Sequence, residues 1–320
     1  MDYTTLGGTG TKVSELCLGT WRFGHESNGV IETTREQAHE LLDAAHDSGI
    51  NFIDTSNNYG SGKSERYIGE WLADRDREEF VLASKVYYTA ESKFDRNLSR
   101  KNIRAEIEGT LDRLGTDYLD IYYIHRFDDE TPIEETLSTL HELVREGKVN
   151  YVGASTTRKR NGAGRKLVEA LWKSDVNDYE PFRVIQPKLN AAHRDSAPEM
   201  IEVAAEQDLA VCPYEPLEGG FLTGKYTRDS APEGSRGDLN DWSEDRFDDR
   251  QWNVVETVSS IADEIDATMP QVSIRWLMDH DQFTCVPIIG SRTPEQLRDN
   301  LGATEISLTE AQHDRITDAY

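Results

Sequence analysis

Four side chains that can carry charge or exchange protons fall at or just beyond the ends of three predicted strands in this 320-residue chain. Asp54 ends the short apolar run that begins at Asn51, and Tyr59 follows five residues later. Lys85 lies near the end of the apolar run 80–86, and His125 ends the run 119–125. A buried strand has no room for an unpaired carboxylate, so Asp54 must lie at the mouth of its strand or have a partner. We therefore expect these side chains to meet where the three strands end.

Taken together, these residue types suit the protonation of a carbonyl oxygen as a hydride arrives. The reference pKa of a tyrosine hydroxyl is ~10, and a nearby ammonium such as that of Lys85 favours the phenolate. Asp54 would hold that ammonium in place, and His125 could hydrogen-bond the same substrate oxygen. Singly, each residue also has a structural interpretation, as a loop cap, a packed aromatic, an exposed strand end and a core histidine. We favour the catalytic interpretation of the set.

Apolar runs alternate with amphipathic segments along the rest of the chain. The predicted strands are 14–20, 51–53, 80–86, 119–125, 149–155, 182–189, 210–214 and 284–289. The predicted helices include 64–73, 99–114, 164–173, 199–207, 254–265, 271–280 and 294–301, and a long polar loop is expected from 218 to about 250. Strands that are near-continuous apolar runs indicate a parallel sheet covered by helices.

The count of eight strands predicts an α/β fold of the (β/α)8 TIM barrel type, with an N-terminal β-hairpin at the GGTG turn and one domain over residues 1–320. In such barrels the chemistry lies at the C-terminal ends of the strands, where Asp54, Lys85 and His125 fall. A doubly wound sheet is the alternative. It is disfavoured because no GxGxxG motif joins a strand to a helix.

Three helix starts carry capping signals. Thr33 with Glu36, Thr131 with Glu134, and Thr309 with Gln312 each match the spacing of a capping box, and Pro132 suits a first helical turn. The first two predict helices that end at Gly49 and Gly147, and the third predicts a short terminal helix.

The charge balance excludes some partners. The chain has 35 basic and 60 acidic residues, and its net charge of -25 opposes binding to nucleic acid or anionic membranes. No apolar run approaches the ~18 residues of a membrane span, and the N-terminus resembles no secretory signal, so we expect a cytoplasmic protein. The spread of acidic residues predicts adaptation to a salty cytosol, with an ordinary acidic protein as the alternative.

Cysteines and basic clusters add little chemistry. Cys17, Cys212 and Cys285 lie in apolar runs, are odd in number and lack zinc-type spacing, which predicts buried reduced thiols and no metal site. The basic residues 158–160 are interpreted as a solvated loop.

From Leu18 to Asn300 the sequence resembles the aldo-keto reductases. The segment DTSNNYG, with Lys85 and His125 spaced after it, is similar to that family's catalytic tetrad. The segments LGTWRFG, TPIEETLSTLHELVREGKVNYVGAS, YEPLEGGFLTGKY and VPIIGSRTPEQLRDNLGA resemble further family segments in the same order. The resemblance implies Tyr59 as proton donor and NADPH or NADH as hydride source.

Carried over position by position, the resemblance implies a cofactor site. Its expected residues are Gly19, Thr20, Trp21 and Asp54 at the nicotinamide end, Ser155 and Gln186 on the carboxamide, Tyr214 on the ring, Leu217, Gly219, Leu222, Gly224 and Lys225 in the pyrophosphate loop, and Gly290, Ser291, Arg292, Gln296 and Asn300 at the adenosine end. Three positions depart from the family pattern: Thr156 replaces a usual Asn, Glu215 a common Ser and Asp299 a common Glu.

The identity of the substrate is less constrained. Trp21, Tyr87, Tyr88 and Phe127 follow or flank strand ends and either line an apolar pocket or pack in the core. A pocket that is polar only at the chemistry would suit an aldehyde, a ketone or a lightly hydroxylated carbonyl compound.

Cofactor choice and two other function classes complete the expectations. Arg292, beside a Thr-Pro helix start, could grip a 2′-phosphate, so we expect NADPH to be preferred over NADH. A cofactor-binding, redox-sensing subunit similar to potassium-channel beta subunits is the alternative. An isomerase or lyase barrel would fit the fold but leaves the cofactor-like loops unexplained.

Overall fold

Eight parallel strands form a closed barrel in the computed structural model, which describes residues 1–27, 29–89, 96–156, 162–233, 235 and 246–320. Their spatial order is β11-β10-β9-β8-β7-β6-β3-β12. The strands are β3 (Cys17–Gly19), β6 (Phe52–Asp54), β7 (Val81–Val86), β8 (Leu119–Ile124), β9 (Val149–Ser155), β10 (Phe182–Gln186), β11 (Ala210–Val211) and β12 (Ile288–Ile289). Val211 closes the ring, because its N–H donates to Thr284 O at 2.8 Å and its carbonyl accepts from Val286 N at 2.9 Å. The predicted TIM barrel is confirmed.

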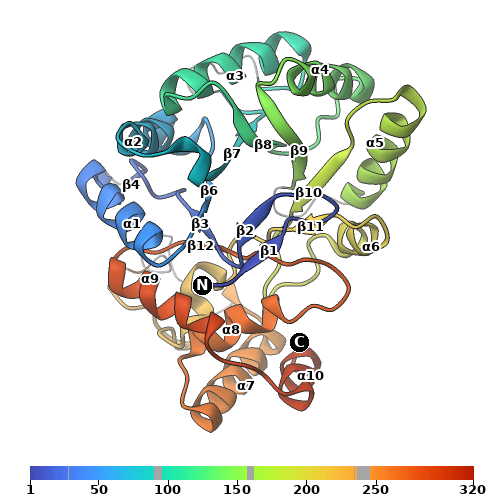
Figure 1. Cartoon of the computed structure of the whole chain (residues 1–320). Coiled ribbons are helices and arrows are strands. Elements are labelled where there is room, and N and C mark those ends of the chain that lie inside the picture. Colours follow the sequence, from blue (N-terminus) through green and yellow to red (C-terminus); the bar gives the residue numbers. More distant parts are fainter. Residues whose placement is uncertain (28, 90–95, 157–161, 234, 236–245) are drawn as a thin grey trace.

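Helices surround this barrel (Figure 1). They are α1 (Arg35–Asp47), α2 (Lys63–Leu72), α3 (Arg100–Leu114), α4 (Ile133–Arg145), α5 (Ala163–Asn177), α6 (Pro198–Glu206), α7 (Asp249–Ile265), α8 (Met269–Met278), α9 (Pro294–Leu301) and α10 (Glu310–Asp318), with short 3₁₀ turns η1 (Tyr59–Gly62), η2 (Arg77–Glu79), η3 (Glu218–Thr223) and η6 (Gly302–Thr304). Apolar side chains fill both the barrel interior and the layer between strands and helices, as the alternating apolar runs require.

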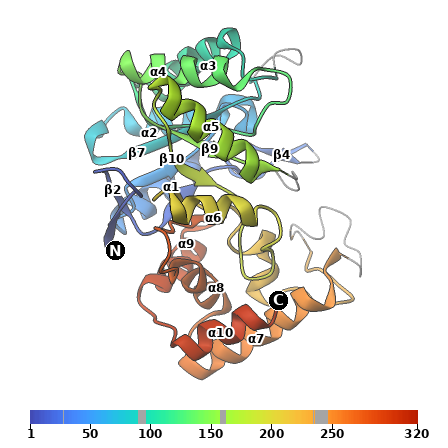
Figure 2. The same cartoon turned by 90° about the vertical axis from the view of Figure 1, so that its right-hand side faces the viewer.

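The predicted N-terminal hairpin is present and closes one mouth of the barrel. Strands β1 (Tyr3–Thr5) and β2 (Lys12–Ser14) pair antiparallel, and Leu6 and Val13 are fully buried in the cluster that fills the barrel interior. Gly7 has a φ of +51°, and a Cβ there would lie 2.5 Å from Ala210 N, so this turn requires glycine. The hairpin lies on the left in the side view of Figure 2, on the same side as the N-terminus.

Two predicted helix caps are wrong. Thr34, not Thr33, caps α1, and it forms a capping box with Gln37 instead of Glu36. The sequence TTREQ offers two overlapping boxes, and the register of the buried face of α1 decides between them.

The start of α4 has no side-chain cap. Pro132 is its N-cap residue, and the Thr131 hydroxyl donates instead to Asp128 at 2.6 Å. Glu134 lies in the first turn of α4 and pairs with Lys173 of α5. The terminal cap pair of Thr309 and Gln312 is confirmed.

Other element bounds also differ from expectation. The strand expected at 14–20 is split into β2 and β3, and a small hairpin of β4 (Glu26–Ser27) and β5 (Val30–Ile31) was not anticipated. Helix α7 begins at Asp249 instead of 254, because Asp248 and Gln251 form a capping box inside the expected loop. Residues 234 and 236–245 of that loop and the basic residues 158–160 lie outside the described residues.

Cys17, Cys212 and Cys285 are buried free thiols, as predicted. Within the described part of the chain, no helix combines the length and the apolar composition needed to cross a membrane.

Candidate active site

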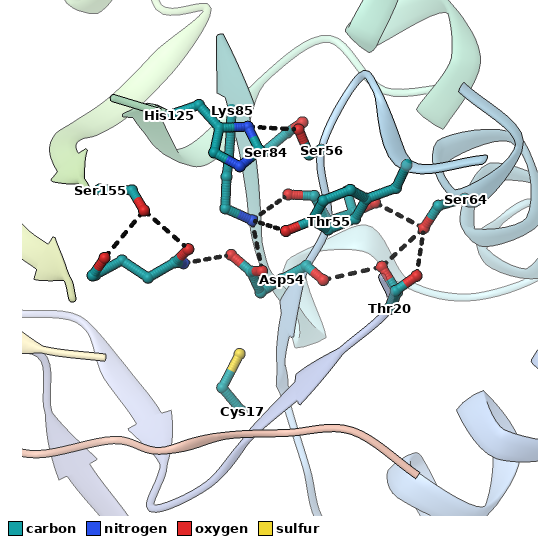
Figure 3. A network of polar contacts seen from close by, with 12 residues as sticks. Cys17, Thr20, Asp54, Thr55, Ser56, Ser64, Ser84, Lys85, His125 and Ser155 are labelled. Atoms are coloured by element: carbon teal, nitrogen blue, oxygen red, sulfur yellow. Dashed lines mark hydrogen bonds and ion pairs between the residues drawn. The ribbon is translucent and has the colours of Figure 1, made fainter. Parts of the chain in front are cut away.

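The ends of β6 and β7 bring Asp54 and Lys85 into direct contact (Figure 3), and Tyr59 contacts Lys85 as well. Strand β6 ends at Asp54, η1 begins at Tyr59, and β7 carries Lys85. The Lys85 ammonium donates to Asp54 Oδ1 at 2.6 Å, to Tyr59 Oη at 3.1 Å and to Thr55 O at 2.8 Å. All three ammonium hydrogens therefore have acceptors, which a fully buried lysine requires.

The second oxygen of Asp54 is also bonded. Gln186, at the end of β10, donates from Nε2 to Asp54 Oδ2 at 2.8 Å. Ser155, at the end of β9, donates to Gln186 O at 2.9 Å and approaches Gln186 Oε1 at 3.4 Å. One network thus joins the ends of β6, β7, β9 and β10, so the amide predicted to bind a carboxamide also orients the Asp54 carboxylate.

The electrostatics of Tyr59 combine two opposed effects. Burial raises the pKa of the Tyr59 hydroxyl above its usual 10, and the Lys85 ammonium lowers it only in part. Burial lowers the pKa of Lys85, but the Asp54 carboxylate and Tyr59 outweigh that effect and raise it. At neutral pH the site therefore holds a protonated phenol beside a charged ammonium, and Lys85 favours the phenolate that remains once the proton has left.

His125 follows β8 and faces the same space. Burial, then the positive charges of Lys85 and Arg126, hold the pKa of His125 well below its usual range. Its Nδ1 lies 3.2 Å from Ser56 Oγ, and its ring lies edge-on to Tyr59 with centroids 6.0 Å apart. The imidazole is neutral at physiological pH, so it can hydrogen-bond a substrate oxygen without adding a second cation.

A chain of hydroxyl groups supports the strand ends from behind. Thr20 donates to Asp54 O at 2.9 Å, and Ser64 at the start of α2 lies 2.8 Å from the hydroxyls of both Thr20 and Thr55. Of these, the sequence reasoning named only Thr20. The run of small hydroxyl residues around the strand end was the available signal, but it does not say which hydroxyls meet.

A cavity of about 860 Å³ opens beside Tyr59 and His125. Most residues of the predicted cofactor site line it: Gly19, Thr20, Trp21, Asp54, Ser155, Gln186, Tyr214, Leu217, Gly219, Lys225, Gly290, Arg292, Gln296 and Asn300. Three do not. Leu222 is buried in the core, Gly224 ends η3 and packs on Met269, and Ser291 accepts a hydrogen bond from Asn300 behind the wall.

The far part of the cavity is suited to phosphate groups. Burial lowers the pKa of the Lys225 ammonium, and the positive charges of Arg292 and Arg22 lower it further. Three cationic side chains therefore converge on one cavity, beside Gly219 and Gly220, whose φ values of +64° and +95° let the backbone approach a ligand closely. Helix α9 also begins here, with Thr293 as its N-cap. A dinucleotide with several phosphates matches this set of cations, glycines and a helix start. Of the three cations, Arg22 was not predicted from the sequence.

The three departures from the family pattern all line the cavity. Thr156 is buried next to Ser155, and its N–H donates to Gln186 O at 3.2 Å. Asp299 accepts hydrogen bonds at Oδ1 from Thr268 at 3.0 Å and from Gln271 at 3.1 Å. This shorter carboxylate therefore ties α9 to the start of α8. Glu215 pairs with Lys188 at 3.2 Å.

The four aromatic candidates divide into two groups. Trp21 and Tyr88 line the cavity, and the Tyr88 ring lies 5.2 Å from that of His125. Tyr87 packs against the hydrophobic core, and Phe127 is buried in it. In the described parts of the chain, no three His, Cys, Asp or Glu side chains are placed to hold a metal ion together.

Comparison with known proteins shows which family this chain is similar to. The model of the aldo/keto reductase family matches residues 15–320. The uncharacterized oxidoreductase YrpG of Bacillus subtilis is 37% identical, over 96% of this chain and 92% of its own length. An NADH-specific methylglyoxal reductase of Escherichia coli is 31% identical, over 97% and 96%. The thermostable aldo-keto reductase Tm1743, whose crystal structure contains the inhibitor epalrestat, is 31% identical in sequence. The match covers 100% of this chain and 100% of that chain, with a TM-score of 0.76.

Proposed function

This chain belongs to the aldo/keto reductase family, and from that premise we propose that it reduces an aldehyde or ketone to an alcohol, with NADPH as cofactor and Tyr59 as proton donor. The observation that carries the proposal is the contact of the Tyr59 hydroxyl with the Lys85 ammonium, 3.1 Å apart, at the wall of a cavity lined by cations. A proton donor and a phosphate site share one space.

The residues around the tetrad would bind and orient. Gln186 and Ser155 would hold the carboxamide of a bound nicotinamide, and Tyr214 would lie against its ring. When bound, the reduced cofactor supplies the hydride that attacks the carbonyl carbon. Leu217, Gly219 and Lys225 would hold the pyrophosphate, and Arg292, Gln296 and Asn300 the adenosine end.

The proton transfer would rest on the tetrad. His125 would hydrogen-bond the carbonyl oxygen and orient it toward Tyr59, which donates its proton as negative charge develops on that oxygen. Lys85 would stabilise the phenolate left on Tyr59, and Asp54 would keep the ammonium charged and in place. The Tyr59 phenolate then takes a proton from solvent, which restores the phenol, and the cycle can repeat.

The shape of the cavity restricts the class of substrate. Its substrate end would lie beside Tyr59 and His125, where Trp21 and Tyr88 contribute aromatic rings to the lining. Such a site favours an apolar or lightly hydroxylated carbonyl compound over a charged one.

A panel of carbonyl compounds assayed with NADPH and with NADH tests the proposal. Aldehydes, ketones and sugar-type carbonyls are incubated at low and at high salt, and oxidation of the cofactor is followed by its absorbance. Turnover that depends on both the carbonyl compound and the cofactor supports a reductase. Tight cofactor binding without turnover on any compound would favour the redox-sensing alternative, and no binding of either cofactor would contradict both.

A further inference from the structure

Lys188 is a buried cation that the proposed chemistry does not use. It lies two residues beyond the end of β10 and is 3% exposed. Its ammonium pairs with two carboxylates, Glu218 Oε1 at 2.5 Å and Glu215 Oε2 at 3.2 Å. Asn190, also buried, donates to Glu218 Oε2 at 2.7 Å and to the backbone oxygen of Glu215 at 2.9 Å. Both glutamates are therefore tied to the segment that follows β10.

The two glutamates lie in the loop that forms the phosphate end of the cavity. Glu215, Leu217, Gly219 and Gly220 line the cavity, whereas Lys188 and Glu218 lie behind its wall. The loop runs from Tyr214 to Lys225, and it contributes both the left-handed glycines and one of the three converging cations. Its backbone conformation thus decides where a phosphate can bind.

That conformation is strained at the two glutamates. Glu215 has a φ of +56° and Glu218 a φ of +48°, in the left-handed region that residues other than glycine rarely adopt. Glu215 also precedes Pro216, and a following proline disfavours helical backbone angles. Such strain persists only where the surroundings impose it. The ion pairs to Lys188 and the hydrogen bonds to Asn190 are contacts that impose it.

We infer that Lys188 is a positioning residue for cofactor binding, which holds the loop Tyr214–Lys225 in its binding conformation through Glu215 and Glu218. The identity of the ligand in this inference rests on the proposed function. The ordering of the loop by Lys188 does not depend on that function. Lys188 also neutralises carboxylate charge beside the place where phosphates would bind. Without it, the backbone would relax at two points, and the negative charge of Glu215 and Glu218 beside an anionic ligand would lose its buried counter-charge from Lys188.

The first test compares Lys188→Met with wild type in two measurements. Amide hydrogen exchange of the unliganded protein should become at least about tenfold faster in residues 214–225 and remain unchanged in β7 and β8. The Kd for NADPH should rise by about 10- to 100-fold, while kcat at saturating cofactor falls much less. Lys148→Met, which removes a surface lysine paired with Glu108, is the matched control and should alter neither. Unchanged exchange in the loop overturns the inference, whether or not the wild type binds a cofactor.

The second test asks whether Lys188 acts through the glutamates. In the background Glu215→Gly/Glu218→Gly, where glycine adopts the left-handed angles freely, adding Lys188→Met should change loop exchange and Kd by less than about threefold. An equal effect in both backgrounds would show that Lys188 acts by another route. If Lys188→Met does not fold, Glu218→Ala and Glu218→Gly replace it. Alanine should speed loop exchange about tenfold more than glycine, and equal exchange in the two variants would overturn the inference.

Discussion

Tyr59 is the residue on which the proposed chemistry depends most directly. Its hydroxyl contacts the buried Lys85 ammonium, and it faces the cavity that also holds His125. Because burial raises the pKa of Tyr59 above 10, the phenol is protonated throughout the neutral range and is ready to donate. Lys85 matters in the opposite state, since it favours the phenolate formed by the transfer.

Replacing Tyr59 by phenylalanine should remove the acid and little else. We expect Tyr59→Phe to bind the cofactor nearly as tightly as wild type but to turn over roughly 10² to 10⁴ times more slowly, the usual contribution of a positioned general acid. Single-turnover kinetics with saturating cofactor measures this. Tyr87→Phe is the matched control, because Tyr87 packs against the core nearby and does not line the cavity. A Tyr59→Phe enzyme that keeps more than half of the wild-type rate would exclude Tyr59 as the acid.

Arg292 should decide the choice between NADPH and NADH. Its side chain lines the cavity beside the start of α9, where a guanidinium can form charge-assisted bonds to a 2′-phosphate. Arg292→Ala should weaken NADPH binding by ~1.5–3 kcal/mol, roughly ten- to a hundredfold, and leave NADH binding little changed. Titrations of both cofactors at one fixed salt concentration measure this.

Arg298→Ala provides the control for this loss of charge. Arg298 lies on the same helix, is exposed, pairs with Glu295 and does not line the cavity. The Arg298→Ala variant should bind both cofactors as tightly as wild type. An equal loss of affinity for NADPH and NADH in Arg292→Ala would show that Arg292 does not recognise the 2′-phosphate.

The sequence located the proposed catalytic residues better than the residues that hold them in place. Asp54, Lys85 and His125 could be placed because each ends an apolar run, and strand ends of a parallel barrel meet at one mouth. Lys188 lies near the end of the predicted strand 182–189, but the sequence does not show that its partners are Glu215 and Glu218, and Ser64 was identified only as the start of a predicted helix. Contacts of that kind depend on which side chains face one another after folding, and a strand pattern does not specify this.

At the scale of elements, the apolar periodicity identified the barrel strands and most of the helices that cover them, but local competition changed their ends. Helix α7 starts inside a segment whose many charged residues indicated a loop, because Asp248 and Gln251 cap it. The β4–β5 hairpin was missed because its two-residue strands are too short for a pattern of alternation.

The packing of α10 against α8 makes stability depend on pH. His280, just after α8, is largely buried, stacks on Phe283 and lies 6.1 Å from the ring of His313 on α10. Burial lowers the pKa of His280 to about 4, and His313 and Arg194 contribute in the same direction, against a smaller opposing effect of Asp279 and Asp281. Among the described residues its Nε2 has no hydrogen-bond partner, so protonation gains no acceptor.

The sign of this dependence follows from the two pKa values. The unfolded chain binds a proton on His280 near pH 6.5 and the folded chain only near pH 4, so the folded state loses stability as the pH falls between them. This loss should reach at most about 3 kcal/mol. Denaturant titrations from pH 8 to 4 should therefore show a steeper fall for wild type than for His280→Phe, with the difference between them constant above pH 7. Parallel curves over the whole range would contradict this role of His280.

At the scale of the whole molecule, two electrostatic effects of salt oppose each other. Exposed pairs such as Arg100 with Glu142 and Arg104 with Glu146 are weakened by salt, but each contributes only about 0–1 kcal/mol. Against them stands the self-repulsion of a chain with 60 acidic and 35 basic residues, which salt relieves. Because the net charge is -25, we expect the relief of repulsion to be the larger effect.

The melting temperature should therefore rise when KCl is increased from dilute buffer to about 1 M, where the Debye length is ~3 Å and charges on neighbouring helices no longer repel one another. Thermal unfolding followed by circular dichroism at pH 7.5 measures the effect.

Repeating the series near pH 4.7, the isoelectric point of the sequence, is the control. There the net charge vanishes, and the gain from salt should shrink, because little repulsion is left to screen. A melting temperature that stays constant or falls with KCl at pH 7.5 would contradict salt adaptation, and the chain would then be an ordinary acidic protein. A gain of equal size at both pH values would point to a general salting-out of apolar surface instead of to charge.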